Sequence, residues 1–427
     1  MRKVLIITYY WPPSGGSGVQ RWLKFSGYLP EYGYEPIIFT PENPSFINQD
    51  PDLLNEVAPE TEVLKLPIWE PYALFEKFSG NKAHQKEVSV GRKKGWKQKW
   101  ASWVRGNLFV PDPRMFWVRP AVKFLENWLP DSGVEMIVTT GPPHSMHLIG
   151  LKLKKKLKIK WLADFRDPWS EWDIMDGFYL SRWALKRHQK LERDVLKTAD
   201  RVVSVGDQMD KDLRRLGARR SSVITNGFDP ANFNNIAGKD IDLDPETCVI
   251  RHIGTIDDMR DPRPLIDLLQ NLKEEQKFRK EVRLEFIGNV SNSLSSYVES
   301  NPKLKQWVSF RSYIPHSEVI QLYLKTDILL LVLAHSHSAK LNVTGKIFEY
   351  MASGVPVLGI GDPEGDAAAI LHESGCGTVT APDDLKLSET LVEWVNREVV
   401  RNSYSLESSP YSRKNLAGDM AKLLDLL

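Results

Sequence analysis

Short runs of consecutive apolar residues recur along this chain and alternate with longer stretches whose apolar residues are spaced three or four positions apart. The short runs are rich in Val, Ile and Leu, as is typical of parallel strands that are buried on both faces of a sheet. In the first half of the chain they predict strands over residues 4–8, 36–39, 136–139, 161–164, 201–204 and 222–225. In the second half they predict strands over residues 249–253, 284–287, 308–310, 328–333 and 355–358.

The longer stretches have the helical period, and they predict helices over residues 19–29, 144–157, 182–197, 207–216, 264–272 and 317–324. Strands that alternate with helices form parallel sheets through right-handed crossovers, with helices on both faces. The pattern therefore predicts an α/β protein built from doubly wound, Rossmann-like sheets.

The alternation is interrupted by a polar segment, residues 228–247, whose Asp-Pro pairs and glycine are typical of a linker. The chain has 427 residues, which suits two domains of about 200 residues each. We therefore expect an N-terminal domain over residues 1–232 and a C-terminal domain over residues 245–405. A second break precedes a last helical pattern, so residues 406–427 are expected to form a separate C-terminal helix.

Composition narrows the class of protein. Apolar residues make up 42% and charged residues 26% of the chain, as in ordinary globular proteins, and no apolar run approaches the roughly 18 residues of a membrane span. The formal net charge of +2 gives no bulk attraction for nucleic acid. Two cysteines are too few for a disulfide framework and show no metal-binding spacing, so we expect a cytoplasmic protein.

One stretch departs from this balance. Residues 91–105 contain six basic residues and no acidic residue, and Trp96, Trp100 and Trp103 lie among them. Basic side chains attract anionic head groups, and tryptophan favours the membrane–water interface. The stretch therefore predicts peripheral attachment to an anionic surface on the inner face of the cell membrane. The alternative is a solvated loop whose tryptophans belong to the core.

Directly after the first predicted strand, a loop carries Gly15, Gly16 and Gly18 and leads into a predicted helix. Glycines let a ligand approach the backbone closely, and the free N–H groups at a helix start attract anionic oxygens. We therefore expect Gly15 and Gly16 to contact a phosphate-bearing ligand, with an ordinary strand-to-helix turn as the alternative. The spacing is not the full dinucleotide fingerprint, which argues against a nicotinamide-dependent dehydrogenase.

Two further segments follow predicted strands, where the carboxyl ends of parallel strands border a ligand crevice. One contains His144, which we expect to face the substrate, with a bystander at a capped helix start as the alternative; His147 is the weaker candidate. The other brings Asp164, Arg166 and Asp167 together. Arg166 and Asp167 are candidates for contact with the reacting groups. The alternative is an Arg166–Asp167 ion pair that positions the loop, and Asp164 is expected to be structural.

In the second half, the main candidates lie on a short predicted helix. It carries Lys346 and Glu349 three positions apart, so the two side chains can share one face. A carboxylate there can accept both hydroxyls of a ribose, and the ammonium can hold a phosphate; the alternative is a surface ion pair worth under about 1 kcal/mol. Upstream, Gly254 and Thr255 end a predicted strand, and Arg260 can bind a diphosphate or simply be solvated.

Downstream, Gly365 and Asp366 precede a further helix and are expected to bind an anion or a sugar hydroxyl. An Asp-x-Asp-x-Asp run at residues 240–244 is similar to acidic motifs that hold a metal and a diphosphate. It lies in the polar linker rather than at a strand end, so we expect a solvated loop and no required metal.

Taken together, these segments resemble bacterial family 4-like glycosyltransferases of the GT-B fold. The resemblance is carried by the glycine loop, by residues 140–144, 164–169 and 224–229, and most specifically by residues 345–358. It implies two facing Rossmann-like domains with an interdomain cleft and a last helix that crosses back to the N-terminal domain. It also implies a retaining transfer from a nucleoside diphosphate sugar, without a metal or other cofactor. The acceptor is expected to be a glycan or a polyprenyl-linked glycan of a cell-surface polysaccharide such as lipopolysaccharide or capsule.

Two positions depart from the family pattern. Many members carry two glutamates in the last motif; Glu349 matches the second, whereas Leu341 stands at the position of the first. Many members also have arginine where this chain has Thr255, a charge that Arg260 can replace. These departures leave two alternatives open. One is a non-catalytic partner subunit that binds sugar nucleotides or glycans, and the other is a sugar-nucleotide epimerase or hydrolase on the same fold.

Overall fold

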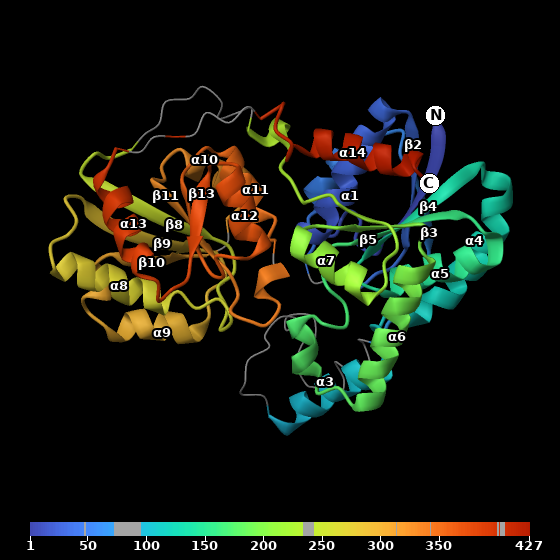
Figure 1. The fold of residues 1–427 in the computed structure, drawn as a ribbon, viewed down its shortest axis with the longest axis horizontal. Helices are drawn as coiled ribbons and strands as arrows, with labels where there is room; N and C mark the ends of the chain where they lie inside the picture. The colour runs from blue at the N-terminus through green and yellow to red at the C-terminus, as the bar shows by residue number, and fades with distance from the viewer. Residues whose placement is uncertain are drawn as a thin grey trace. The chain divides into compact units, whose positions relative to one another are not determined.

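The computed structural model describes residues 1–46, 48–71, 95–233, 243–312, 314–341, 343–398, 401 and 406–427. Arg92, Lys93 and Lys94 of the predicted membrane segment lie outside these residues, as do positions 240–242 of the acidic run. The chain divides into two units, Met1–Asn226 with Arg413–Leu427 and Gly227–Ser412 (Figure 1).

The first unit contains, within the residues that the structure describes, a seven-stranded parallel sheet of order β3-β2-β1-β4-β5-β6-β7. The chain moves to one side of β1 and then returns to build the other side. Such a reversal leaves a crevice beyond the carboxyl ends of β1 and β4, where doubly wound proteins bind ligands. The strands are β1 (Arg2–Ile7), β2 (Tyr34–Pro41), β3 (Glu62–Leu66), β4 (Val134–Gly141), β5 (Lys160–Phe165), β6 (Arg201–Ser204) and β7 (Ser221–Val223).

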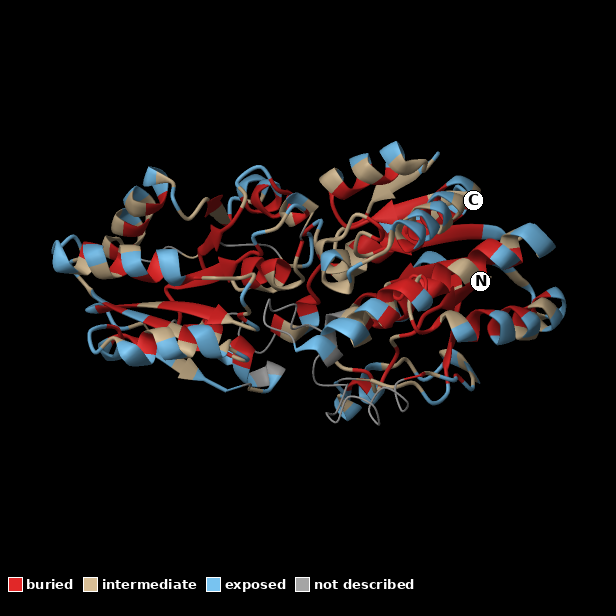
Figure 2. Cartoon of the chain, turned by 90° about the horizontal axis from the view of Figure 1, so that it is seen from below, coloured by how far each residue is buried: buried red, intermediate tan, exposed pale blue. Residues whose placement is uncertain are grey.

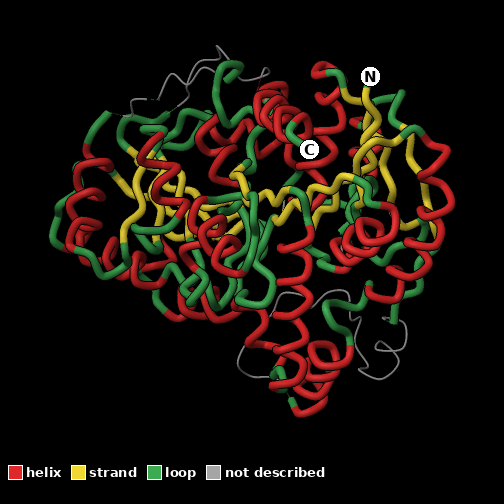
Figure 3. Tube along the Cα trace, turned by 45° about the vertical axis from the view of Figure 1, so that its right-hand side comes forward, coloured by secondary structure: helices red, strands yellow, loops and turns green. Residues whose placement is uncertain are grey.

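Helices lie on both sides of the strands (Figure 3). On one face, Leu416, Met420 and Leu424 of the last helix, α14, share a core with Val19 and Trp22 of α1. The last helix therefore returns to the N-terminal sheet, which confirms the predicted crossing back. The helices of this unit are α1 (Ser17–Tyr28), α3 (Trp96–Leu108), α4 (Met115–Ser132), α5 (Ser145–Leu157), α6 (Arg182–Thr198), α7 (Asp207–Leu216) and α14 (Arg413–Asp425).

The second unit contains, again counting described residues only, a six-stranded parallel sheet of order β10-β9-β8-β11-β12-β13. Successive residues of β11 alternate between two cores: Leu329 and Leu331 pack into one, and Ile328 and Leu330 into the other. The strands are β8 (Thr247–Ile253), β9 (Glu281–Ile287), β10 (Val308–Arg311), β11 (Ile328–Val332), β12 (Val357–Ile360) and β13 (Gly377–Thr380). The helices are α8 (Arg263–Glu274), α9 (Asn292–Ser300), α10 (His316–Tyr323), α11 (Lys346–Ala352), α12 (Asp366–Glu373) and α13 (Leu385–Asn396).

Burial follows the same arrangement in each unit. Buried residues run along the strands and the inward faces of the helices, and exposed residues line the outer helix faces (Figure 2). The uninterrupted apolar runs therefore do form parallel strands covered on both sides, and the predicted doubly wound α/β architecture is confirmed. Among the described helices, none combines the length and apolar character that crossing a bilayer requires.

The structure differs from the sequence-based expectation at one edge strand of the first sheet and at the domain boundary, among other places. Strand β3 was not predicted because it lies at the sheet edge, is only partly buried and includes Glu62 and Lys65. The predicted boundary at residue 232 also differs, because Phe228 and Phe233 are buried in a core of the second unit. These two aromatic side chains, set in an otherwise polar segment, decide to which unit residues 227–233 belong.

Candidate functional site

The candidate site of the first unit gathers at the carboxyl ends of β1, β4 and β5. After β1, the loop that holds Gly15 and Gly16 leads into α1, whose start has no side-chain cap. The Gly15 N–H donates to the Asn48 carbonyl at 3.0 Å, so the protein already uses this donor. Gly16 has a φ of 88°, and no atom lies within 4 Å of the place where its Cβ would stand. Gly16 is therefore the residue that leaves the start of α1 open to an anion.

Arg166 joins two of the loops at this edge. Its guanidinium donates to the Gly18 carbonyl at 2.6 Å and to the Pro142 carbonyl at 2.5 Å, and its N–H donates to the Gly141 carbonyl at 2.9 Å. The guanidinium makes these bonds and forms no ion pair with Asp167, so the alternative of an Arg166–Asp167 ion pair is wrong. The geometry gives Arg166 a positioning role, and contact with the reacting groups stays a prediction.

Asp164 is held entirely by the protein. Its buried carboxylate accepts hydrogen bonds from the Arg21 guanidinium at 3.0 and 3.2 Å, the Trp22 indole at 2.7 Å and the Thr140 hydroxyl at 3.0 Å. Arg21, also buried, donates further to two carbonyls that follow β7. This cluster joins α1, β4, β5 and the end of β7, in agreement with the structural role expected for Asp164.

His144 and His147 lie at the start of α5, and both are buried. His144 Nε2 contacts the Pro168 carbonyl at 3.2 Å and the ring stacks on Trp169 at 4.8 Å, whereas His147 Nδ1 contacts the Thr139 hydroxyl at 2.9 Å. Neither remaining ring nitrogen has a hydrogen-bond partner in the described part of the chain. Burial lowers the pKa of both histidines, that of His147 to about 3, so both imidazoles are neutral at physiological pH.

Two features that the sequence did not reveal fix the start of α5. Asp112 accepts hydrogen bonds from the Ser145 N–H and the Ser145 hydroxyl, each at 2.8 Å. Gly141 makes room for both imidazoles, because a Cβ there would lie 2.6 Å from His147 Nε2 and 3.2 Å from His144 Nδ1. Asp112 caps the helix from a distant part of the chain, so no local capping pattern indicated it.

Asp167 is the acidic residue predicted to contact the reacting groups. The residue is half-buried, and no described group donates a hydrogen bond to its carboxylate. Burial raises the pKa of Asp167, and the nearby charge of Arg166 opposes the shift. A carboxylate with a raised pKa and free acceptor atoms is suited to take a proton from a hydroxyl.

In the second unit, Lys346 begins α11 and lies over Gly254, at the carboxyl end of β8. A Cβ on Gly254, whose φ is 141°, would stand 1.8 Å from the Lys346 Nζ, so only glycine leaves room for the ammonium. None of the described residues accepts a hydrogen bond from Lys346. Burial and the charge of Arg260 lower the pKa of Lys346 to about 8, against the opposing charges of Glu349 and Asp257. The site therefore holds a half-buried cation suited to an anionic ligand.

Glu349 lies one turn after Lys346 on α11, close enough for their charges to interact. The hydroxyl of the buried Tyr323 lies 3.5 Å from the Glu349 carboxylate. The next residue, Tyr350, accepts a hydrogen bond from the Ile253 N–H at 3.0 Å. This bond fixes α11 to the end of β8, and it therefore helps to hold the Lys346 side chain over Gly254.

The other residues considered for the donor site in this part of the chain are Arg260, Thr255 and Leu341. The Arg260 guanidinium forms an ion pair with Asp257 at 2.5 Å, so a bound diphosphate competes with that carboxylate. Thr255 is exposed. Leu341 is half-buried in a short 3-10 helix, Ala339–Leu341, and brings no charge to the site.

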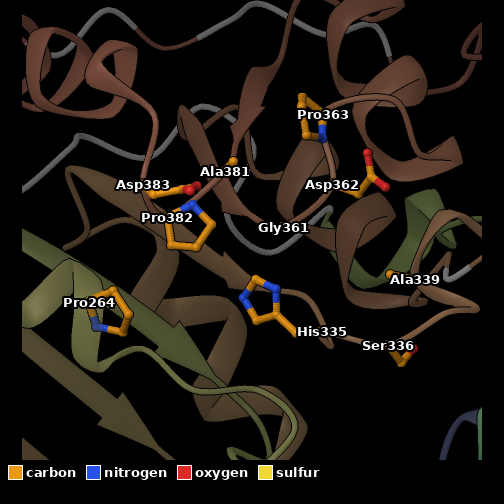
Figure 4. A pocket seen from close by; sticks show the side chains of 10 residues that line it. All are labelled: Pro264, His335, Ser336, Ala339, Gly361, Asp362, Pro363, Ala381, Pro382 and Asp383. Atoms are coloured by element: carbon orange, nitrogen blue, oxygen red, sulfur yellow. The ribbon is translucent and has the colours of Figure 1, made fainter.

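A cavity of about 600 Å³ opens at the carboxyl ends of β11, β12 and β13 (Figure 4). Prolines and alanines form much of its wall, and His335, Asp362 and Asp383 add polar groups. Its lining residues are Pro264, His335, Ser336, Ala339, Gly361, Asp362, Pro363, Ala381, Pro382 and Asp383. The predicted Gly365 caps the start of α12 just after this wall, and Asp366 is buried in the first turn. The three strand ends would have indicated this cavity, but β13 was not predicted.

The acidic run of the linker shows no metal-binding arrangement where it is described. Asp244 accepts hydrogen bonds from the Thr247 hydroxyl at 2.7 Å and from the Glu246 N–H at 3.0 Å, which makes it part of a local turn. Elsewhere in the described ranges, no group of three or more His, Cys, Asp or Glu side chains is arranged to hold a metal ion.

Comparisons with known proteins agree with these features. Residues 88–227 match the model of the glycosyl transferase 4-like domain. No curated protein matches the chain. Similar solved structures include sucrose-phosphate synthase from Thermosynechococcus elongatus, which is 13% identical with a TM-score of 0.60 over 100% of this chain and 99% of that chain. WaaG, a glycosyltransferase involved in lipopolysaccharide biosynthesis, is 14% identical with a TM-score of 0.51 over 99% of this chain and 95% of that chain.

A third similar structure is a putative UDP-N-acetylglucosamine 2-epimerase from Listeria monocytogenes, 10% identical with a TM-score of 0.55 over 99% of this chain and 95% of that chain. At these identities the likeness concerns the fold. The two parallel sheets, the returning helix α14 and the family match all lead to the same assignment. The chain therefore has the GT-B fold, and its residues 88–227 match the glycosyl transferase 4-like domain.

Proposed function

We propose that this protein is a retaining glycosyltransferase that moves a sugar from a nucleoside diphosphate sugar to a glycan or polyprenyl-linked acceptor, in the biosynthesis of a cell-surface polysaccharide. The observation that carries the proposal is the ammonium of Lys346, which pairs with no described residue and lies over Gly254, one helical turn from Glu349. A cation and a carboxylate so placed at the end of a parallel sheet match the two hydrophilic parts of a nucleoside diphosphate.

In this proposal the second unit binds the donor. Lys346 holds the diphosphate, and Arg260 assists once it exchanges Asp257 for a phosphate. The Glu349 carboxylate accepts hydrogen bonds from the ribose hydroxyls. The Tyr323 hydroxyl supports this carboxylate. The backbone near Gly254 and Thr255 borders the phosphates. The cavity that Gly361 lines, together with the turn at Gly365 and Asp366, receives the sugar or the base.

The first unit binds the acceptor and contributes the remaining groups. In a retaining transfer the acceptor oxygen bonds to the anomeric carbon on the same face from which the diphosphate departs, and the diphosphate leaves with the electron pair of the broken bond. Asp167 is placed to take the hydroxyl proton, and His144, neutral through burial, offers a hydrogen bond to the sugar or the acceptor. Gly15 and Gly16 border the leaving phosphate. Positioned cations that stabilise such a leaving group contribute about 3 kcal/mol each.

We further propose that the transfer needs no metal or other cofactor, because Lys346 and Arg260 supply the positive charge that a metal would otherwise bring to the diphosphate. We also propose that the protein is cytoplasmic and attaches peripherally to the membrane through residues 91–105. The similarity of the fold to WaaG, a glycosyltransferase involved in lipopolysaccharide biosynthesis, supports this class of function without fixing the substrate.

A second candidate is a sugar-nucleotide epimerase or hydrolase. It is favoured by Leu341, which removes a carboxylate from the family motif, and by the fold similarity to a putative UDP-N-acetylglucosamine 2-epimerase. The two functions differ in one observable. An epimerase or hydrolase converts the donor in the absence of any acceptor, whereas a transferase leaves the donor largely intact until an acceptor is added.

A thermal-shift panel of UDP-, GDP- and dTDP-linked sugars tests the proposed donor site. We expect one nucleotide class to raise the unfolding temperature of the wild-type protein and to have no effect on a Glu349→Ala variant. If no sugar nucleotide stabilises the protein, or if the variant responds as the wild type does, the donor site is wrongly assigned.

The pKa of Lys346 predicts a pH dependence of donor binding. With a pKa of about 8, the Lys346 side chain is positively charged at neutral pH, and it loses this charge as the pH rises through 8. The dissociation constant of the nucleotide should therefore rise by up to about tenfold per pH unit above that value, whereas an ordinary lysine stays charged to about pH 10. Calorimetric titration over this range measures the effect. A Lys346→Arg variant, which stays charged, should give a flat profile; a wild-type profile equally flat would contradict the role of Lys346.

A further inference from the structure

Helix α6 of the first unit presents a continuous basic face. The structure describes all of α6, and apart from Trp183 each of its exposed residues is a lysine or an arginine. These residues are Arg182, Lys186, Arg187, Lys190, Arg193 and Lys197. None of them forms an ion pair with a described residue. Unpaired cations along one helix, with no exposed acid between them, repel one another unless an anionic partner is present.

Aromatic and basic residues share the N-terminal half of this face. Trp183, Lys186, Arg187 and Lys190 follow the i, i+3, i+4, i+7 spacing of one helical side. Trp183 is 61% exposed, and the Arg187 guanidinium lies over its ring at 5.3 Å. A tryptophan with an exposed ring beside cations is the combination that favours a membrane–water interface.

Helix α3 lies beside α6 (Figure 1). It carries a second set of exposed tryptophans. Trp100 and Trp103 are 60% and 40% exposed. The C-terminal end of α3 is fixed to the segment before α6, because the Asn107 side chain accepts a hydrogen bond from the Ser181 N–H at 2.7 Å. Gly106 allows this close packing, since a Cβ there would lie 2.5 Å from the Phe178 side chain. The two helices therefore present their tryptophans from one rigid part of the first unit.

We propose that Trp100, Trp103, Trp183, Lys186, Arg187 and Lys190, here called the α3–α6 surface, bind an anionic phospholipid bilayer. The proposal goes beyond the basic stretch in the sequence, because the charges that act with the tryptophans come from α6, about 80 residues later in the chain. It extends the proposed function, since it supplies the means by which a lipid-linked acceptor reaches the first unit.

The inner side of α6 connects this surface to the candidate acceptor site. His188 accepts a hydrogen bond from the Trp169 indole at 3.1 Å, and its other nitrogen lies 3.4 Å from the Gly106 carbonyl of α3. Trp169 in turn stacks on His144, with the ring planes 1° apart. A chain of direct contacts thus runs from α3 through α6 to His144, so the α3–α6 surface and the acceptor site belong to one rigid assembly.

Flotation of the full-length protein with vesicles tests the proposal. The vesicles contain phosphatidylcholine alone or phosphatidylcholine mixed with phosphatidylglycerol. The wild type should float only with the anionic vesicles, and less so at high salt, because screening weakens the attraction. Replacing Lys186, Arg187 and Lys190 by glutamine should lower the partition coefficient about a hundredfold. A Trp183→Ala variant should also float less than the wild type.

A matched control comes from the second unit. Lys277, Lys305 and Lys386 are exposed and without ion-pair partners among the described residues, and their replacement by glutamine changes the net charge by the same amount. This control should float as the wild type does. If the α6 triple variant floats as well as the control, or if the wild type fails to float, the proposal is overturned. It is also overturned if the surface proves to join two copies, so that Trp183→Ala converts a dimer to a monomer and no variant binds vesicles.

Nucleotide binding separates this proposal from the proposed function. The α6 triple variant should keep the thermal shift that the preferred sugar nucleotide gives to the wild type, because the donor residues lie in the second unit. Loss of flotation with retained nucleotide binding supports the α3–α6 surface. Flotation that persists in a protein that binds no sugar nucleotide would overturn the donor site and leave this surface standing.

Discussion

Replacing Lys346 by methionine is expected to lower kcat/KM for sugar transfer by a factor of about 100 to 1,000, the usual loss when one positioned donor to a developing anion is removed. Methionine fills a similar volume over Gly254 but brings no charge to the diphosphate. Glu349→Gln should cause a smaller loss, about ten- to hundredfold, because a neutral amide still accepts one ribose hydrogen bond. Initial rates against the preferred donor measure both effects.

Lys340→Met is the matched control for this experiment. Lys340 lies six positions before Lys346, is exposed and pairs with Glu364 at 2.6 Å. Its loss removes the same charge from the same unit but from a surface ion pair, so kcat/KM should change less than twofold. If Lys346→Met is as active as Lys340→Met, the ammonium over Gly254 does not act on the donor.

The second large effect concerns stability. Arg21→Met should lower the free energy of unfolding of the first unit by about 3 to 5 kcal/mol, because it leaves the carboxylate of Asp164 buried without its cation. The Trp22 and Thr140 donors remain, but neither carries a charge. Urea denaturation followed by circular dichroism measures the loss. The variant should also lose transfer activity, since Asp164 joins the elements that carry the acceptor site.

Arg215→Met tests whether the burial of the Arg21–Asp164 pair is the reason for the large loss of stability. Arg215 pairs with Glu171 and Asp212 on the surface, so this substitution should cost less than about 1 kcal/mol. Equal losses for Arg21→Met and Arg215→Met would show that the Asp164 cluster contributes no more than an exposed ion pair.

The apolar runs predicted most strands of the two sheets, because strands covered on both faces consist mainly of apolar residues. Strand β11 is the clearest case, with both faces covered. Strand β3 escaped prediction for the opposite reason, since an edge strand that is only partly buried tolerates the exposed charges of Glu62 and Lys65. Polar composition alone placed the boundary between the units at residue 232. The buried Phe228 and Phe233 pack in the second unit, so the boundary lies earlier.

For the candidate site, sequence reasoning found residues at strand ends but not the contacts that assign their roles. The loop around Arg166 was predicted, yet its bonds to the Gly18 and Pro142 carbonyls join segments more than 20 residues away. Asp112 and the fit of Gly254 to Lys346 are likewise long-range contacts that spacing along the chain does not encode. The basic face of α6 was in the sequence, but its significance depends on which side of the helix is buried.

A crystal structure of the protein with the sugar nucleotide that stabilises it most tests the donor assignment directly. We expect the diphosphate within hydrogen-bond distance of the Lys346 Nζ, and the ribose hydroxyls on the Glu349 carboxylate. A nucleotide bound away from α11, with Lys346 and Glu349 making no contact with it, would contradict the account.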